Sequence, residues 1–304
     1  MGNYLEDILS QPDQLERLFE AYSEEGFLRE KMKRLSEHKW GNIIFTGMGS
    51  SHFCAVGAGL YLKEKGIDNQ VVSTGELLYY EREIIKENTL LILISQSGES
   101  AETVKLLGKL PEQVFVVGIT NEPDSTLAKN SALVCPLLVD REESVTTRTY
   151  LASVCACLWA ADAIAGGEGC DMTKKIRRGT ECLRKAVQQS KEYEGKIKEF
   201  AENCSAPAIM GRGYSMGSVA AGALFLREVA KIPAMEFDEA EFKHGPLEMV
   251  EKGFKAVILA PEGEGMLMNV RMAESIVKKG GEVLLITDGS CTALEEERLR
   301  IIRL

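Results

Sequence analysis

The sequence predicts an α/β protein in which doubly wound parallel sheets carry helices on both faces. First, its apolar runs, such as residues 90–94, are short and lack polar alternation, as in strands that are buried on both faces. Second, segments with apolar residues at helical spacing separate these runs. Third, glycines and hydroxyl residues follow the strands, and 28 glycines against 8 prolines fit many tight strand-to-helix turns.

The first half alternates between strand and helix patterns after an N-terminal helical stretch. Its first strand pattern ends in a Gly-Met-Gly-Ser-Ser loop, and Gly66 is expected to close the helix that follows this loop. The expected elements are two helices within 3–38, a strand at 42–46, a helix at 52–65, a strand at 71–73, a helix at 76–86, a strand at 90–94, a helix at 101–110, strands at 114–119 and 133–136, and a long apolar helix at 144–165.

The second half follows a charged helical stretch and weakly repeats the first. A shift of 164 residues superimposes like residues: Gly49 and Gly213, Ser51 and Ser215, Glu64 and Glu228. A shift of 165 superimposes Gly98 on Gly263 but Ser95 on Ala260, which predicts a duplication in which one copy kept its hydroxyls. The expected elements are a strand at 207–210, a helix at 215–230, a strand at 255–259, a helix at 266–279, and strands at 283–286 and 300–304.

Composition restricts the class of partner. The net charge of −10 argues against nucleic acid or an anionic membrane as the main partner. The first ten residues are amphipathic and acidic, unlike a signal peptide, and no apolar run approaches the ~20 residues of a membrane span. Eight scattered cysteines are expected to be reduced thiols, and three histidines exclude a histidine-rich metal site. A cytoplasmic protein is therefore expected.

The stretch 89–105 holds the strongest functional signal. The strand at 90–94 ends in the sequence Ser-Gln-Ser-Gly-Glu-Ser before a helix begins at Ala101. Such a loop directs backbone N–H groups and hydroxyls at one place, where the helix dipole also favours an anion. The alternative is that Ser100 is simply the N-cap of the helix, with Thr103 in its first turn. Capping explains one hydroxyl, whereas a phosphate site explains all three and the glycine.

Two further loops are expected at the same edge of the first sheet. Gly49, Ser50 and Ser51 follow the first strand, and the hydroxyl-rich residues 143–148, which include Ser144 and Val145, lie at the start of the long helix. In a doubly wound sheet, ligands bind beyond the carboxyl ends of the strands. The first loop lacks the third glycine of a dinucleotide fingerprint, so the site is predicted to hold a compact phosphate and a polyol.

The second half carries the candidate ionisable groups. Glu228 lies among apolar residues of a predicted helix, where a carboxylate can serve as a general base; the alternative is a solvated helix residue, as its repeat partner Glu64 suggests. His244 precedes Gly245 and Pro246 in a turn that could support proton transfer, although a single histidine is more often structural.

Three segments together resemble the SIS (sugar isomerase) family, which includes the isomerase half of glucosamine-6-phosphate synthase: SQSGESAET at 95–103, GRGYSMGSVAAGALFLREVAKIPAMEF at 211–237 and EFKHGPLEM at 241–249. The resemblance implies two SIS domains of the flavodoxin-like kind. Their expected bounds are 40–167 and 206–304, with N-terminal helices at 1–39 and a helical linker at 168–205.

The resemblance also implies roles for individual residues. Glu228 would move the proton between two sugar carbons, and His244 would assist ring opening from the partner subunit of a homodimer with a shared active site. No metal and no cofactor are expected. The residues expected to hold the sugar phosphate are Ser50, Ser51, Ser95, Gln96, Ser97 and Ser100.

The sequence departs from the family pattern in three respects. No glutaminase domain precedes the SIS pair, Phe225 stands where the synthase has a lysine, and Leu304 ends the chain before the family's lysine-bearing tail. The expected function is a phosphosugar aldose-ketose isomerase, more narrowly an isomerising deaminase of an amino-sugar phosphate such as glucosamine 6-phosphate. The alternatives are a fructosamine-phosphate deglycase and a phosphosugar-binding sensor without turnover.

Overall fold

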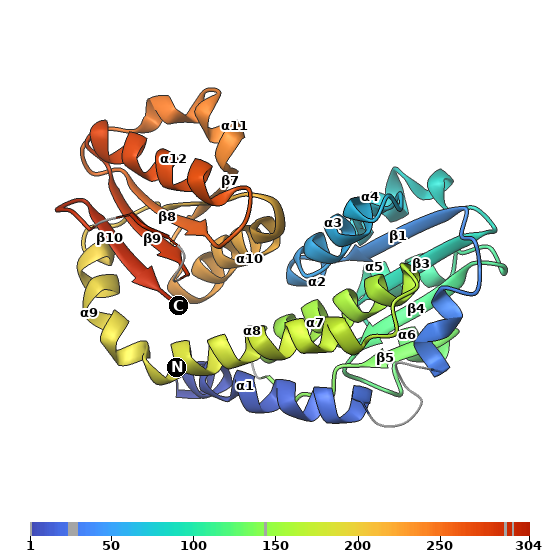
Figure 1. The fold of residues 1–304 in the computed structure, drawn as a ribbon. Helices are drawn as coiled ribbons and strands as arrows, with labels where there is room; N and C mark the ends of the chain where they lie inside the picture. Colours follow the sequence, from blue (N-terminus) through green and yellow to red (C-terminus); the bar gives the residue numbers. More distant parts are fainter. Residues whose placement is uncertain (1, 24–29, 143–144, 289–290, 294) are drawn as a thin grey trace. The chain divides into compact units, whose positions relative to one another are not determined.

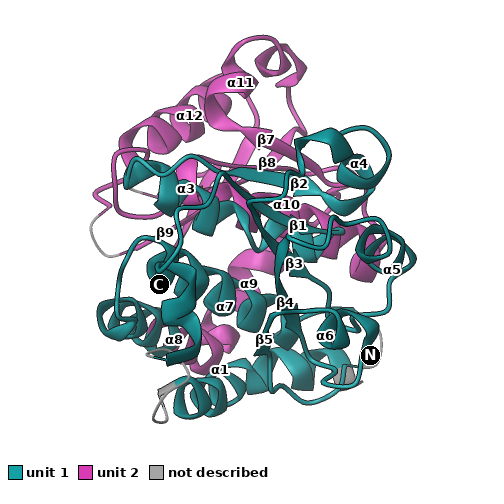
Figure 2. Cartoon of the chain, turned by 90° about the vertical axis from the view of Figure 1, so that its right-hand side faces the viewer, with its two compact units in different colours: residues 1–181 teal, residues 182–304 magenta. Residues whose placement is uncertain are grey.

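The structure, a computed structural model, describes residues 2–23, 30–142, 145–288, 291–293 and 295–304. The chain divides into two compact units, residues 1–181 (unit 1) and residues 182–304 (unit 2), which are coloured separately in Figure 2. Among the described helices, none has the length and apolar character needed to cross a membrane.

Unit 1 contains a five-stranded parallel sheet with the order β2-β1-β3-β4-β5 (Figure 1). The chain starts near the centre, moves to one edge at β2, and then crosses to the other side of β1, so the switch point lies between β1 and β3. The strands are β1 (Asn42–Gly47), β2 (Gln70–Ser73), β3 (Thr89–Ile94), β4 (Phe115–Thr120) and β5 (Leu133–Pro136).

Helices cover both faces of this sheet because alternate strand residues are apolar on each side. Leu91 and Leu93 pack with Leu77, Leu106 and Leu127 from the helices on one face, namely α4 (Thr74–Tyr79), α5 (Ala101–Leu107) and α6 (Thr126–Lys129). The intervening strand residues are equally buried. Further helices of this unit are α7 (Arg148–Ile164) and the two helices that pack on it, α1 (Gly2–Ser23) and α3 (Val56–Glu64).

Unit 2 contains a second five-stranded parallel sheet, with the order β10-β9-β8-β6-β7. Its strands are β6 (Ala208–Gly211), β7 (Met235–Asp238), β8 (Lys255–Ala260), β9 (Glu282–Thr287) and β10 (Leu299–Arg303). The helices α9 (Ser190–Ala201) and α10 (Met216–Phe225) pack on one face, and α11 (Glu239–Lys243) and α12 (Met266–Lys278) on the other. In sequence, α8 (Cys170–Gln188) runs across the boundary between the units.

The predicted fold class is confirmed, and the two sheets share one topology. In each unit the strands lie in the order second, first, third, fourth, fifth. β1 ends at Gly47 and β6 at Gly211, 164 residues later, in agreement with the predicted repeat. β3 ends at Ile94 and β8 at Ala260, so the offset there is 166 and not 165. Ser95 therefore corresponds to Pro261, which corrects the expected pairing of Ser95 with Ala260.

Several predicted elements differ in their bounds. The sequence prediction omitted β7 and α11, because β7 is a four-residue strand that carries Glu236 and Asp238 and follows Pro233. The predicted helix at 52–65 is divided into α2 (Ser50–Phe53) and α3. The predicted helix at 76–86 ends at Tyr79 and continues as a 3₁₀ turn, Arg82–Ile84. The long helix predicted from residue 144 begins at Arg148.

Candidate functional site

A polar cavity of about 150 Å³ lies in unit 1 at the carboxyl ends of β1 and β3. This is the switch point of the sheet, where doubly wound proteins bind their ligands. Four of its lining residues were predicted individually from the sequence, and of the other five, Thr146 lies in the predicted hydroxyl-rich loop 143–148. The predicted ones are Ser50, Ser51, Gln96 and Val145, and the others are Glu142, Thr146, Thr149, Tyr150 and Ser153.

The loop after β1 brings its two serines to the cavity by a close backbone contact. A Cβ atom on Gly47 would lie 2.5 Å from the Ser51 carbonyl oxygen, so the strand end accepts only glycine while the first turn of α2 packs against it. Gly49 has φ of 53° at the N-cap position of α2. The amide of Ser51 donates to the Met48 carbonyl at 3.0 Å, which leaves both serine hydroxyls half-buried at the cavity wall.

The loop after β3 presents Gln96 to the cavity and leaves several of its own donors available. The Gln96 carbonyl accepts from the Thr120 hydroxyl and the Asn121 amide, both at 3.0 Å, which fixes the loop to the end of β4. Within the described part of the chain, the backbone N–H groups of Gln96, Ser97 and Ser100 donate no hydrogen bond to the protein. This loop therefore offers donors to a bound anion.

Gly98 and Glu99 fix the same loop on its outer side. Gly98 has φ of 62°, and a Cβ there would collide with the side chain of Ser125. The Glu99 carboxylate accepts hydrogen bonds from the backbone N–H and the hydroxyl of Thr126. These bonds lower the pKa of Glu99, and the bond from the N–H has the larger effect. The acidic residue of the loop therefore caps α6.

The remaining serines of this loop do not line the cavity. Ser95 is buried, and the Ser97 hydroxyl accepts from the Glu99 amide at 3.2 Å. Ser100 is the N-cap residue of α5, but its hydroxyl donates to Thr103 at 2.7 Å and makes no capping bond. Ser100 thus occupies the N-cap position that the capping alternative predicts, but its side chain does not make the capping hydrogen bond.

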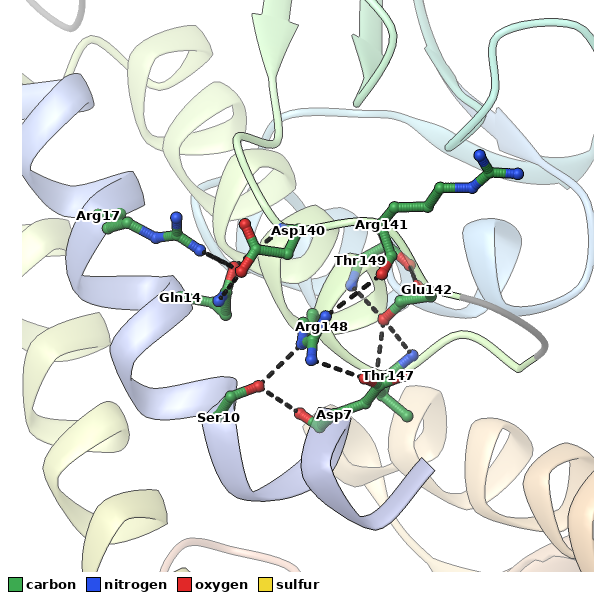
Figure 3. Close-up of polar contacts among 10 residues, drawn as sticks. All are labelled: Asp7, Ser10, Gln14, Arg17, Asp140, Arg141, Glu142, Thr147, Arg148 and Thr149. Atoms are coloured by element: carbon green, nitrogen blue, oxygen red, sulfur yellow. Dashed lines mark hydrogen bonds and ion pairs between the residues drawn. The ribbon is translucent and has the colours of Figure 1, made fainter. Parts of the chain in front are cut away.

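The third wall comes from the segment before α7 and from the start of that helix. One Glu142 carboxylate oxygen accepts from the Thr147 amide at 2.7 Å, the Thr147 hydroxyl at 2.8 Å and the Thr149 amide at 3.1 Å (Figure 3). Glu142 thus satisfies the exposed N–H groups at the start of α7, which explains why this helix begins at Arg148. Of the two residues predicted here, Val145 lines the cavity and Ser144 lies outside the described residues.

The lining is chemically suited to a small polar ligand. Glu142 is the acidic residue among the described lining residues, and its carboxylate is engaged with the start of α7. The other polar side chains are hydroxyls and one amide, which can donate to phosphate oxygens and both donate to and accept from sugar hydroxyls. The residues that sequence reasoning missed carried no motif; they reach the cavity because α7 packs against α2 and α3.

The two predicted catalytic residues lie in unit 2. Glu228 belongs to a π-helical turn, Leu226–Ala230, that extends α10, and its side chain is exposed in place of the expected apolar surroundings. Such π-turns occur frequently at functional sites. His244 is the C-cap residue of α11 and is exposed; it precedes Gly245, which has φ of 150°, and Pro246 at the start of a 3₁₀ turn.

Two doubly wound parallel sheets, with a hydroxyl-lined cavity at one switch point, define an α/β protein whose cavity is suited to a small polar ligand. The family model of the SIS domain matches residues 38–161 and 205–304. The chain therefore belongs to the SIS domain family.

Curated relatives and solved structures agree with this assignment. The chain is 32% identical over 261 residues to glutamine–fructose-6-phosphate aminotransferase (isomerizing) of Pyrococcus horikoshii, covering 82% of this chain and 43% of the relative. It thus spans less than half the length of that relative. The C-terminal domain of glucosamine-fructose-6-phosphate aminotransferase from Francisella tularensis superimposes with a TM-score of 0.86 at 25% identity, covering 99% of this chain and 88% of that one. Glucosamine-6-phosphate deaminase from Thermotoga maritima shares the fold, with a TM-score of 0.69 at 23% identity over 92% and 84% of the two chains.

Proposed function

We propose that this protein is a phosphosugar aldose-ketose isomerase, and more narrowly an isomerising deaminase of an amino-sugar phosphate such as glucosamine 6-phosphate. The observation that carries the proposal is the cavity at the ends of β1 and β3, with Ser50, Ser51 and Gln96 in its wall. A phosphate ester would accept hydrogen bonds from these side chains and from the free N–H groups of Gln96, Ser97 and Ser100. Ser95, Ser97 and Ser100 would shape that loop.

The proposed chemistry requires a ring-opened sugar and a base. His244 would assist ring opening, and Glu228 would remove the proton from C2 of the open-chain amino sugar to give an enolamine. Return of the proton to C1 gives a 2-imino sugar, which water hydrolyses to the ketose and ammonia. Hydroxyls and N–H groups stabilise the negative charge that develops on oxygen. These roles rest on the resemblance of 211–237 and 241–249 to the family motifs.

The test is a coupled assay for ammonia and fructose 6-phosphate with a small panel of substrates. The panel contains glucosamine 6-phosphate, its N-acetyl and galacto forms, glucose 6-phosphate and fructoselysine 6-phosphate. Release of ammonia with formation of the ketose supports the deaminase. Turnover of fructoselysine 6-phosphate alone would replace it with a deglycase. Saturable binding by calorimetry without turnover of any member would replace it with a phosphosugar sensor.

We also propose a homodimer in which His244 acts in the active site of the partner subunit. Sedimentation tests the dimer, and mixed variants test the shared site. Glu228→Gln and His244→Ala subunits, inactive alone, would regain about a quarter of wild-type activity when mixed at random, because half of the dimers would contain one intact site of two. No recovery from mixed dimers would place both residues in the site of one subunit.

A further inference from the structure

The helix α1 carries a polar stripe that is directed at the segment before α7. Asp7, Ser10, Gln14 and Arg17 are spaced three or four residues apart, so they lie on one face of the helix (Figure 3). Two of these side chains, Asp7 and Gln14, are buried. The family match begins at residue 38, so α1 lies outside it and has no assigned role.

The first contact is a buried ion pair. The Arg148 guanidinium lies 2.6 Å from the Asp7 carboxylate, and the two side chains are 10% and 11% exposed. Arg148 also donates to the Ser10 hydroxyl at 2.8 Å, and Ser10 donates to the Asp7 carbonyl at 3.0 Å. A buried charge that loses its partner is strongly unfavourable, so this pair fixes Arg148 to α1.

The second contact lies at the other end of the same segment. The Gln14 side-chain amide donates to the Asp140 carboxylate at 2.8 Å and accepts from the Asp140 backbone N–H at 2.9 Å. Arg17 adds an exposed ion pair to Asp140 at 2.9 Å. These bonds hold the pKa of Asp140 below its usual range, and the hydrogen bond from Gln14 has the largest effect.

Residues between these two contacts form one wall of the cavity. Glu142, Val145, Thr146 and Thr149 line it. Arg148 lies between Thr147 and Thr149, whose backbone N–H groups donate to the Glu142 carboxylate. The segment is thus held at residue 140 and at residue 148 by the same helix. The Glu142 bonds are internal to the segment, so α1 supplies its side-chain bonds at residues 140 and 148, beside the two hydrogen bonds that join Val139 to Asn121.

We infer that α1 is a positioning element of the ligand site: the Asp7–Arg148 ion pair and the Gln14–Asp140 bonds hold the cavity wall formed by Glu142, Val145, Thr146 and Thr149 in its binding geometry. Asp7, Gln14 and Arg148 are positioning residues, because they act through the wall and not on the ligand. This inference rests on the proposed function only for the identity of the ligand, a sugar phosphate. The effect of α1 on the cavity wall does not depend on that identity.

The test compares Asp7→Asn with wild type in the full chain. The expected result is a KM for the sugar phosphate raised about tenfold or more, with kcat changed less than about threefold, because a displaced wall weakens binding before it affects proton transfer. Amide hydrogen exchange should accelerate in peptides covering 145–153 and stay unchanged in the peptide covering β3. Asp7→Glu should restore both values in part.

Two further variants keep the test decisive. Asp171→Asn removes an exposed ion pair with Lys174 elsewhere in unit 1 and should change neither value. Gln14→Leu removes the second contact and should reproduce the effect if Asp7→Asn does not fold. The inference is overturned if Gln14→Leu or Asp7→Asn shows the wild-type rate of amide hydrogen exchange in 145–153. It is also overturned if exchange accelerates uniformly across unit 1, because that would mean a purely structural role. Absence of binding and turnover in wild type would instead remove the proposed function and leave the exchange comparison intact.

Discussion

The carboxyl ends of the two sheets have the same topology but opposite chemistry. In unit 1, β1 and β3 are followed by serines and a glutamine that line a cavity. In unit 2, Arg212 follows β6 and is paired with the buried Glu239 at 2.9 Å, while Glu262 and Glu264 follow β8. The Glu262 amide donates to the Asp288 carboxylate. Unit 2 therefore has an acidic edge that disfavours an anion where unit 1 has donors for one.

A buried lysine of unit 2 lies at the opposite, amino ends of its strands. Lys255 begins β8, is 7% exposed, and donates at 2.8 Å to the carbonyls of Phe200 and Glu202 at the end of α9. It also pairs with Glu282 at the start of β9. This network fastens a helix to the amino ends of the strands, far along the sheet from any switch-point ligand. Under the proposed function, one repeated scaffold would use its polar residues for binding in unit 1 and for packing and chemistry in unit 2.

The largest expected effect separates chemistry from binding. Glu228→Gln should lower kcat by about 10²–10⁴-fold while calorimetric affinity for glucosamine 6-phosphate stays unchanged, because the amide keeps the shape of the base but cannot accept the proton. The repeat partner gives a matched control, since Glu64→Gln should leave both values at wild-type level. An equal loss of kcat in the two variants would mean that the two glutamates at this repeat position do not differ in function.

The next effect concerns the rigidity of the loop after β3. Gly98→Ala should lower the free energy of unfolding by about 2–5 kcal/mol, because the new methyl group collides with Ser125 and φ is positive. Gly66→Ala, at φ of 74° with no heavy atom within 4 Å of the added carbon, should cost about 1–2 kcal/mol from backbone strain alone. Urea unfolding measures both. A similar loss in the two variants would mean that the loop adapts to the methyl group.

Much of the fold was predictable because its signals are local. Buried strands such as 90–94 and the glycines that follow them appear directly in the sequence, and they correctly indicated two parallel doubly wound sheets. Elements whose ends depend on distant partners were not predictable. α7 begins at Arg148 because the Glu142 carboxylate caps it, and the edge strand β7 exists because β6 supplies its hydrogen-bonding partner.

The site divides in the same way. Ser50, Ser51 and Gln96 were predicted because strand ends of a parallel sheet meet at one edge. Tyr150 and Ser153 were missed because they lie inside an apolar helical pattern, and only the packing of α7 brings them to the cavity. The polar stripe of α1 could have been found, since Asp7, Gln14 and Arg17 interrupt the apolar face at helical spacing, but its target could not.

A smaller effect tests the difference between the two edges residue by residue. Ser51→Ala should weaken phosphosugar binding by about 1–3 kcal/mol, the scale of a lost hydrogen bond to a charged group. Its repeat partner Ser215 is buried beside the acidic edge of unit 2, and Ser215→Ala should leave the affinity unchanged. Calorimetry with glucosamine 6-phosphate measures both. A weaker affinity in the Ser215 variant would assign the second edge to the ligand as well.

The smallest expected effect is a pH dependence confined to unit 1. Burial lowers the pKa of His52, which follows Ser51 in α2, and a backbone hydrogen bond at Val71 opposes this shift without cancelling it. A histidine whose folded pKa lies below its unfolded value stabilises the fold fully above the unfolded value, near 6.5, and loses this contribution as pH falls below that value toward the folded pKa. Wild-type unfolding free energy should therefore decline between pH 7.5 and pH 5.5. The decline should be smaller in His52→Gln, and because the comparison is made in the absence of ligand, titration of the sugar phosphate does not contribute. An equal decline in both proteins would assign it to other groups and leave the turn that carries Ser50 and Ser51 insensitive to pH.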